Sequence, residues 1–449
     1  MKRNTIYIAM ALLGLSSSND LYAQKHTLTL KAALEMAKEG NKTLQIQLLE
    51  ELNSKEVIRE TKNNFLPSIS ANAGYSYYFD RQVIFLPGYF ANSTKPVQDI
   101  TVGGKNVYNA YLSLYQPIFD SKKQQQIKIA NLNDDIEKEK TEDLSSRIAY
   151  QVSAHYLTMV LMNHQENLLQ ESLQRNIQAL KDSRSLYEQG RSLKSDTLRS
   201  SLAVSNLKSS LSYLKSTIEV AAIELKRLIG TDALGEIEVT DELILTEDAR
   251  IKSLYQIEDA VGIAQNNRKD LIIQQLAIHL QEKKKKAIQA EQLPQLSVVG
   301  QYQIQAQEDT MEFGQYALPK TTYLGVQLNI PIFSGNRIKS QINQAKIKTH
   351  QEEIKLADLN DKVKTELSTI LSKQKEGFSQ LDIQQNAVEL AELNQQMIDN
   401  RFKNGLGSRL ELTDAELALT QAKLSYSNAL YTLRMLEIEL QFALGLLDL

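Results

Sequence analysis

The distribution of proline constrains this chain more than any other feature. All seven prolines lie in two windows, residues 67–117 and 294–331, and the stretches 118–293 and 332–449 have none. Because proline breaks helices and ends strands, the proline-free stretches are expected to be helical. Residues 120–189 also lack glycine. A helix of that length would be about 100 Å long, which predicts an elongated protein.

The helix that follows has a coiled-coil period. Between residues 207 and 228, apolar residues recur in alternating steps of four and three. A repeat of 3.5 residues is typical of helices that pack side by side. The positions are Leu207, Leu211, Leu214, Ile218, Ala221, Leu225 and Leu228.

The same pattern returns 215 residues later, which indicates a tandem duplication. The second copy reads Ala422, Tyr426, Ala429, Leu433, Leu436, Leu440 and Ala443. The turns also correspond, "YEQG" at 187–190 with "FKNG" at 402–405. We expect a first repeat over 24–230, a linker over 231–256 and a second repeat over 257–449. The long helices are predicted at about 120–189, 192–229, 336–404 and 408–445.

The two proline windows alternate between apolar and polar residues, as half-buried strands do. This pattern predicts four strands, at about 68–81, 107–119, 295–307 and 321–333. Each is as long as a membrane strand needs to be, but a half-buried soluble sheet alternates in the same way. The strands alone therefore leave both interpretations open.

The first residues resemble a secretory signal. Lys2 and Arg3 precede the apolar run 6–15, and a small residue, Ala23, follows a polar stretch. We interpret 1–23 as a signal peptide, since an apolar run of ten residues is too short to span a membrane. The protein is therefore expected outside the cytoplasm.

Composition argues against several other classes of function. Basic and acidic residues nearly balance, at 51 and 54, so no nucleic-acid footprint is present. The chain has no cysteine, which removes disulfides, thiolate metal sites and a lipid anchor on cysteine. The five histidines lack ligand spacing and no catalytic motif is found, so we predict no enzyme and no cofactor.

Four strands cannot close a barrel, and lipid does not tolerate an open sheet edge. If the strands lie in a membrane, several chains must supply them. A symmetric trimer would supply twelve strands, although these physical arguments only suggest that number.

Taken together, these features resemble the TolC-like outer-membrane efflux proteins. The resemblance rests on the signal peptide, the duplication, "LP" before the first strand of each half, "QPIFD" (116–120), "IPIFSGNR" (330–337) and the "YEQG" and "FKNG" turns. It implies a mainly helical fold with membrane β-structure, in which each protomer has four strands and two long coiled-coil hairpins. Three protomers would form a twelve-stranded barrel in the outer membrane and a helical barrel in the periplasm of a Gram-negative bacterium.

The resemblance also implies a function as a passive exit duct for efflux or type I secretion. The partners would be a periplasmic adaptor, an inner-membrane pump and outer-membrane lipid, with no nucleic acid. The adaptor would dock at the helical turns. In this chain the docking residues would be Tyr187, Gly190, Arg191, Phe402, Gly405 and Leu406.

Family members carry carboxylates at the periplasmic entrance, shortly after the turn glycine. The corresponding acids here are Asp196, Glu411 and Asp414. Threefold symmetry would make each of them a ring of charges that binds cations or assists gating. The alternative is that they are solvated acids in the first helical turn, favoured by the helix dipole.

We interpret the repeated "PIF" segments as junctions between membrane strand and periplasmic helix. The junction residues are Pro117, Phe119, Pro331, Phe333 and Gly335. Pro331 is expected to end the last strand, and a helix is expected to begin at Arg337. The first half lacks the glycine of the second, with Ser121, Lys122 and Lys123 after "QPIFD".

Two further predictions concern the membrane end. Residues 82–105 are expected to form an external loop, and its apolar "VIFLPGYF" suggests packing across the barrel mouth. Tyrosines of the strands are candidates for interfacial girdles. They are Tyr75, Tyr77, Tyr78, Tyr108, Tyr111, Tyr115 and Tyr323.

A trimeric outer-membrane adhesin, or another structural coiled-coil protein, is the alternative function. Adhesins also build a barrel from four strands per chain, but at the C-terminus, whereas here the strands are internal and divided between two halves. The cargo is not predicted, because a passive tunnel keeps little substrate chemistry in its sequence.

Overall fold

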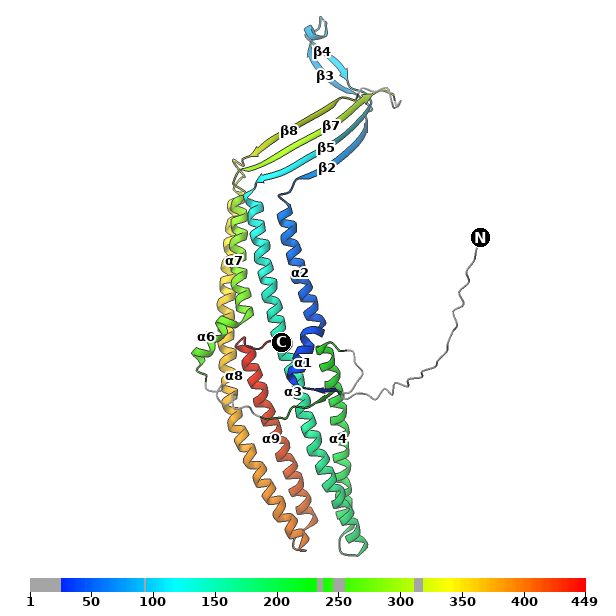
Figure 1. Ribbon diagram of the computed structural model, residues 1–449, viewed down its shortest axis with the longest axis vertical. Helices are drawn as coiled ribbons and strands as arrows, with labels where there is room; N and C mark the ends of the chain where they lie inside the picture. The colour runs from blue at the N-terminus through cyan, green and yellow to red at the C-terminus, as the bar shows by residue number, and fades with distance from the viewer. Residues whose placement is uncertain (1–25, 93, 232–236, 245–254, 311–317) are drawn as a thin grey trace, which may run out of the picture.

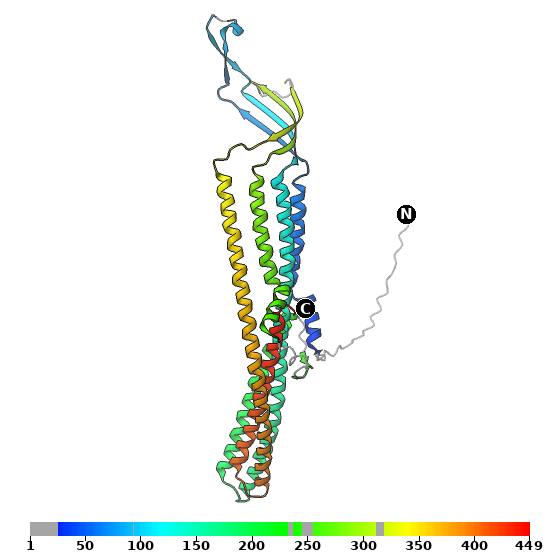
Figure 2. The same ribbon diagram turned by 90° about the vertical axis from the view of Figure 1, so that its left-hand side faces the viewer.

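The protein is a long rod of helices with a small β-sheet at one end (Figures 1 and 2). The computed structural model describes residues 26–92, 94–231, 237–244, 255–310 and 318–449. The expected signal peptide, 1–23, lies outside the described residues, as do 232–236 and 245–254 of the linker.

The helices come in two matching sets. The first set is α1 (Leu30–Gly40), α2 (Lys42–Asn63), α3 (Ser121–Glu188) and α4 (Lys194–Ile229). The second set is α6 (Ile257–Asn267), α7 (Lys269–Ala290), α8 (Arg337–Lys403) and α9 (Arg409–Ala443). Their lengths are 11, 22, 68 and 36 residues against 11, 22, 67 and 35. The four long helices begin and end within two residues of their predicted limits.

The coiled-coil positions lie at the helix contacts, as predicted. Leu207, Leu211, Leu225 and Leu228 are buried in the first copy, and the other three positions are half-buried. In the second copy the last four positions are buried and the first three are half-buried. Each shorter helix therefore packs along its long partner through one apolar seam.

The four expected strands form one antiparallel sheet in the order β2-β5-β7-β8. They are β2 (Ser68–Tyr77), β5 (Asn106–Phe119), β7 (Gln295–Glu308) and β8 (Lys320–Asn329). The repeats thus meet at the centre of the sheet, between β5 and β7. One strand of each repeat, β2 and β8, forms a free edge of the protomer.

Both edge strands are shorter than predicted, because their neighbours set their length. β2 ends at Tyr77 opposite Asn106, where β5 begins, so 78–81 have no strand to pair with. β8 ends at Asn329 opposite Gln295, the first residue of β7. The prediction that the last strand continues to Pro331 is therefore wrong.

Residues 82–105 contain two strands that the sequence did not predict. β3 (Gln82–Pro87) pairs with β4 (Val97–Val102), and the short 3-10 helix η1 (Gly88–Ala91) follows β3. This outer hairpin extends beyond the four-stranded sheet (Figures 1 and 2). Apolar residues of β3 occupy both faces of the hairpin, so the period-two pattern is missing.

The neighbours of the helices change halfway along the rod. Near the sheet, the helices are neighbours in the order α2, α3, α7, α8, and at the far end in the order α4, α3, α9, α8. The long helices α3 and α8 run through both halves. As in the sheet, each repeat forms one edge of the protomer. The edge of the first repeat consists of α2 and α4, and the edge of the second repeat consists of α8.

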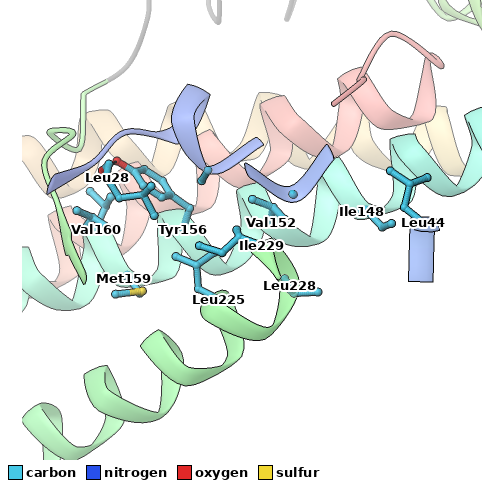
Figure 3. Close-up of a cluster of buried hydrophobic side chains, with 13 residues drawn as sticks. Leu28, Leu44, Ile148, Val152, Tyr156, Met159, Val160, Leu225, Leu228 and Ile229 are labelled. Atoms are coloured by element: carbon cyan, nitrogen blue, oxygen red, sulfur yellow. Dashed lines mark hydrogen bonds between the residues drawn. The ribbon is translucent and has the colours of Figure 1, made fainter. Parts of the chain in front are cut away.

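The middle of the rod contains the largest cluster of buried apolar side chains (Figure 3). There β1 (His26–Leu28) pairs in parallel with β6 (Ile237–Val239). Tyr156 of α3 is fully buried, and its hydroxyl donates to the backbone oxygen of Leu28 at 2.9 Å. A second cluster, including Leu271, Leu367 and Leu440, lies among α6, α7, α8 and α9.

Among the described residues, no helix is both long enough and apolar enough to cross a membrane.

Candidate functional site

The strand register divides the sheet side chains into one apolar and one polar face. The apolar face includes Ile69, Ala71, Ala73, Tyr75, Tyr108, Ala110, Leu112, Leu114, Val298, Tyr302, Ile304, Leu324, Val326 and Leu328. The polar face includes Ser68, Ser70, Asn72, Asn109, Tyr111, Ser113, Gln301, Gln303, Gln305, Thr321, Tyr323 and Gln327. This separation extends across all four strands, with exceptions such as Gln116, Glu308 and Lys320 on the apolar face and Val107 and Val299 on the polar face.

The apolar face is uncovered in the protomer. Ile69, Leu324 and Val326 are each more than 70% exposed, which is unusual for large aliphatic side chains on a sheet. Tyr75 and Tyr108 lie on this face toward the outer end of the sheet, with ring centroids 5.0 Å apart. An apolar face with aromatic residues near its end is typical of a sheet surrounded by lipid.

The seven candidate girdle tyrosines do not share one face. Tyr75, Tyr77 and Tyr108 belong to the apolar face, but Tyr111, Tyr115 and Tyr323 belong to the polar face, and Tyr78 follows the end of β2. Of the seven candidates, only Tyr75, Tyr77 and Tyr108 are therefore placed on the face that suits a girdle in lipid. The cause is the alternation of side chains along a strand, which residue type alone does not reveal.

At the other end of the molecule, both helical turns use the same backbone motif. Gly190 and Gly405 have positive φ values of 70° and 74°. In the first turn the Gly190 N–H donates to Tyr187, and in the second the Gly405 N–H donates to Phe402, at 2.9 and 3.0 Å. Glycine ends helices in this way because it adopts the left-handed conformation without strain.

The candidate docking residues are grouped at these two turns. Leu406 is 73% and Tyr187 44% exposed, and Arg191 is also exposed. Phe402 is half-buried, and the guanidinium of Arg409 lies 5.2 Å from its ring centroid. The two turns lie at the same end of the rod (Figure 1).

Two of the three candidate gate acids have a local structural partner. The Asp196 carboxylate accepts from the backbone N–H of Leu193 at 3.3 Å. The Glu411 carboxylate accepts from the N–H of Ser408 at 3.4 Å, and the Ser408 hydroxyl accepts from the N–H of Glu411 at 3.1 Å. These are capping contacts, which stabilise the first helical turn. Asp414, one turn further along α9, is exposed.

A buried pair of ionisable residues near the turns was not expected from the sequence. Glu416 is 7% exposed, and its Oε2 atom has no hydrogen-bond partner among the described residues. Burial raises the pKa of Glu416 against the opposing effect of Arg409 and Arg175. Burial also lowers the pKa of Arg409, with nearby acids acting against that shift. Arg409 and Glu416 are two helical turns apart on α9, and that spacing was their only signal in the sequence.

The two strand-to-helix junctions are built differently. Pro117 stays within β5, at a register shift that ends at Phe119, and Asp120 caps α3 by accepting from the Lys123 N–H at 3.1 Å. The second junction uses two left-handed residues, Gly335 and Asn336, before α8 begins at Arg337 as predicted. Phe333 at this junction is 84% exposed, while its counterpart Phe119 is 44% exposed.

Comparison with known proteins places these features in a family. The family model described as "Outer membrane efflux protein" matches residues 33–231 and 260–446. The two matched segments correspond to the two repeats and leave out most of the linker.

The chain belongs to the outer membrane efflux protein family.

A curated protein resembles the chain in sequence, and solved structures resemble it in fold. Alkaline protease secretion protein AprF of Pseudomonas aeruginosa is 24% identical over 355 residues, covering 76% of this chain and 70% of AprF. The outer membrane protein VceC of Vibrio cholerae superposes with a TM-score of 0.72 at 15% identity, covering 93% of this chain and 96% of VceC. The outer membrane channel MtrE of Neisseria gonorrhoeae, in an open state, gives a TM-score of 0.72 at 16% identity, covering 93% and 89%.

Family membership locates this protein in the outer membrane as an export channel. The family and the solved relatives are channel proteins rather than enzymes. The amphipathic sheet is the part of the protomer that suits lipid on one side and water on the other.

Proposed function

We propose that three copies of this chain form a passive exit duct that spans the outer membrane and continues through the periplasm. The observation that carries this proposal is the amphipathic sheet with two unpaired edges, β2 and β8. An open edge in lipid would leave backbone N–H and C=O groups without partners. Pairing β8 of one chain with β2 of the next satisfies both edges and closes a twelve-stranded barrel.

The edge helices support the same assembly. α8 at one edge exposes Ile347, Ile354 and Leu390, at 61%, 57% and 68%. At the other edge, α2 exposes Leu49 and α4 exposes Leu202, at 63% and 61%. Large aliphatic side chains exposed in numbers along a helix favour a partner surface. In the proposed trimer, α8 of one chain packs against α2 and α4 of its neighbour.

The duct works with a periplasmic adaptor and an inner-membrane pump, and the adaptor docks at the two helical turns. The matching geometry at Gly190 and Gly405 supports this placement, because each hairpin presents one open glycine turn at the same end of the rod. No heavy atom lies within 4 Å of a Cβ built on either glycine, so both turns leave room for a partner's side chain.

Glu411 and Asp414 form carboxylate rings at the periplasmic entrance, together with Asp196. The exposure of Asp414 favours this role for that residue. For Asp196 and Glu411 the capping contacts support a structural role as well, and a test has to separate the two.

The proposal is tested by measuring the ion conductance of the purified protein in planar lipid bilayers. We expect discrete conductance steps, and we expect the double variant Glu411→Gln with Asp414→Asn to lose block by multivalent cations. Gln keeps an acceptor for the Ser408 N–H, so that the helix cap survives while the charge is removed. Ser408→Ala, which removes the capping hydroxyl and keeps both carboxylates, serves as the control for loss of the cap.

A protein that gives no conductance contradicts the duct. If the protein conducts but multivalent cations block the double variant as strongly as the wild type, the duct is supported and the carboxylate rings are contradicted.

A further inference from the structure

The helices carry a surplus of positive charge where they meet the sheet. The twelve residues of α2, α3, α7 and α8 nearest the strands are 52–63, 121–132, 279–290 and 337–348. Together they contain 14 basic and 3 acidic side chains, whereas the whole chain has 51 basic and 54 acidic residues. The surplus is therefore local to this end of the helices. We call these four segments the basic belt.

The charge of the two long helices reverses at the limit of the belt. The first twelve residues of α3 and α8 contain seven basic and no acidic side chains. The next twelve, 133–144 and 349–360, contain three basic and nine acidic side chains. Both repeats have this reversal. Twelve residues span about 18 Å of helix, so the positive charge is confined to a narrow zone beside the sheet.

Several lysines of the belt are not used to hold the protomer together. Glu291 pairs with Lys122 at 2.9 Å and with Arg337 at 3.2 Å, which joins α3, α7 and α8. Other lysines, from all four helices, are exposed and form no ion pair within the described part of the chain. They are Lys62, Lys128, Lys286, Lys339, Lys346 and Lys348.

The belt does not serve the stability of its helices. Lys122 and Lys123 lie in the first turn of α3, and Arg337 and Lys339 in the first turn of α8, and neither first turn contains an acid. The helix dipole disfavours cations at this end, and neighbouring like charges repel one another. A negatively charged partner outside the protomer would compensate both effects.

The strands that adjoin the belt place it at the boundary of the lipid. β2, β5, β7 and β8 connect directly to these helix ends (Figure 1). The apolar face of the sheet reaches this end, where Ile69 and Leu328 are 72% and 58% exposed. Lysine and arginine side chains within a Debye length of an anionic lipid surface are attracted to it. A long lysine side chain can also bring its ammonium group to the level of the phosphates.

The lysines of α8 lie on both flanks of the helix. Ile338 and Ala345 are buried and mark the side that packs within the protomer. Lys339 and Lys346 are seven residues apart and share one flank, whereas Lys348 lies about 200° from Lys346 around the helix axis. Whichever flank faces the lumen of the closed barrel, the other faces outward. The belt therefore presents cations to the outside of the duct.

We propose that the basic belt binds the phosphate groups of anionic phospholipids in the periplasmic leaflet of the outer membrane and thereby fixes the depth of the duct in that membrane. This inference rests on the proposed function, because the belt meets lipid only if the sheet forms the membrane barrel. A belt that serves anions inside the lumen is the alternative that the test has to exclude.

The test uses tryptophan fluorescence, because the chain has no tryptophan of its own. Leu328→Trp places one probe on the apolar face at the periplasmic end of β8, and Ile69→Trp places a second probe at the same end of β2. Tyr108→Trp is the control probe, toward the outer end of the same face.

The trimers are reconstituted in mixtures of phosphatidylglycerol, which is anionic, and phosphatidylcholine, which is neutral. Bromine on the acyl chains of one lipid quenches the probe, so titration of the mixture gives the ratio of the two binding constants. At Leu328→Trp we expect phosphatidylglycerol to bind at least about fivefold more tightly, and at Tyr108→Trp we expect a ratio near one.

Substitutions in the belt make the test specific. In the Leu328→Trp background, Lys339→Gln, Lys346→Gln and Lys348→Gln together remove three cations from the belt of each chain. We expect this triple variant to lower the preference for phosphatidylglycerol to about twofold or less. Salt at about 1 M, where the Debye length is about 3 Å, should lower the preference of the unsubstituted belt in the same way.

A matched control removes equal charge from the same helix outside the belt. Lys364→Gln, Lys373→Gln and Lys375→Gln also neutralise three exposed lysines of α8. Because these positions lie well beyond a Debye length from the sheet, the lipid preference should stay unchanged.

Three outcomes overturn the inference while the duct stands. They are equal binding of the two lipids beside the unsubstituted belt, equal effects of the belt and control substitutions, or a belt variant that keeps its lipid preference but changes the anion-to-cation selectivity of the channel. The last result would assign the belt to the lumen. A probe at Leu328 or Ile69 that neither brominated lipid quenches would place the sheet outside the membrane, which overturns the proposed function itself.

Discussion

At the scale of single residues, the two repeats preserve the same contact with different side chains. Asn41, between α1 and α2, donates from Nδ2 to the backbone oxygen of Leu228 at 2.8 Å. Arg268, between α6 and α7, donates from Nη1 to the oxygen of Ala443 at 3.3 Å. Both bonds occupy acceptors in the last turn of a helix, which otherwise lack partners. After an old duplication, equivalent contacts are expected to be made by different side chains, here an amide and a guanidinium. A comparison of residue identities between the repeats does not reveal such a contact.

Gly230 lies at the end of α4, where the chain packs closely against the end of α1. It has a φ of 73°, and a Cβ built on it would collide with the backbone carbonyl of Gly40. We predict that Gly230→Ala costs at least about 3 kcal/mol, from left-handed strain plus the collision. Gly190→Ala is the matched control, because Gly190 has a φ of 70° in open space and should cost only about 1 kcal/mol. Thermal unfolding followed by circular dichroism compares them, and equal losses of stability would contradict the packing argument.

Glu416 predicts how stability depends on pH. Burial raises its pKa above the ordinary value of 4.5. In the unfolded chain the carboxyl ionises near that ordinary value, whereas in the folded chain it must ionise in a buried place. The folded state is therefore penalised increasingly as pH rises through the raised pKa, and the penalty disappears as pH falls below 4.5.

We accordingly predict that Glu416→Gln raises the unfolding temperature at neutral pH and flattens its dependence on pH. The charged groups acting on Glu416 come from three helices, namely Arg409 on α9, Arg175 on α3 and Asp399 on α8. Glu439→Gln, at a half-buried position elsewhere on α9, is the control. If the variant and the wild type have parallel pH profiles, the assigned role of Glu416 is wrong.

At the scale of elements, the long helices could be predicted closely and the membrane end less well. The four long helices contain no proline and a single glycine, Gly377 of α8, and the shorter helix of each hairpin has a 3.5-residue seam. Such signals are local in the sequence, so the limits of these helices were found to within two residues. Edge strands end where their neighbours end, and the outer hairpin has apolar residues on both faces. Both depend on contacts with distant residues, which no local pattern records.

The second junction gives a test at this scale. Gly335 has a φ of 60° and no neighbouring heavy atom within 4 Å of a built Cβ. Gly335→Val should strain the backbone by about 1–3 kcal/mol, because a β-branched residue rarely adopts that conformation. We predict a severalfold lower yield of assembled protein, with the ion selectivity of the remaining channels unchanged.

Gly262→Val on α6, outside the strands that are proposed to pair between chains, is the control for this junction. Its surroundings are equally open but its φ is not positive, so assembly should be normal. Yields are read by size-exclusion chromatography in detergent. Comparable yields of the two variants would mean that the left-handed turn at residue 335 is not required for assembly.

At the scale of the whole molecule, the sequence predicted the duplication and the protomer fold, because both leave periodic traces along the chain. It could not place β5 beside β7, or show that one strand from each repeat is left unpaired at an edge. These facts come from the register of the sheet, and they support the proposed arrangement of three chains. The division of the sheet into an apolar face and a polar face follows from the same register.

The central claim is that β8 of one chain pairs with β2 of the next. Because the chain has no cysteine, engineered pairs can test this contact without interference from native thiols. Ser70→Cys on β2 is combined in turn with Tyr323→Cys, Gly325→Cys or Gln327→Cys on β8, all on the polar face. The control is Ser70→Cys with Ser113→Cys, which lie opposite each other within one chain.

The decisive measurement is the mass of the oxidised products from native membranes on a non-reducing denaturing gel. The account predicts that at least one β2–β8 pair gives a covalent trimer that returns to monomer on reduction, while the control pair remains monomeric. If no β2–β8 pair yields a species larger than the monomer although the control disulfide forms, the three-chain barrel is contradicted.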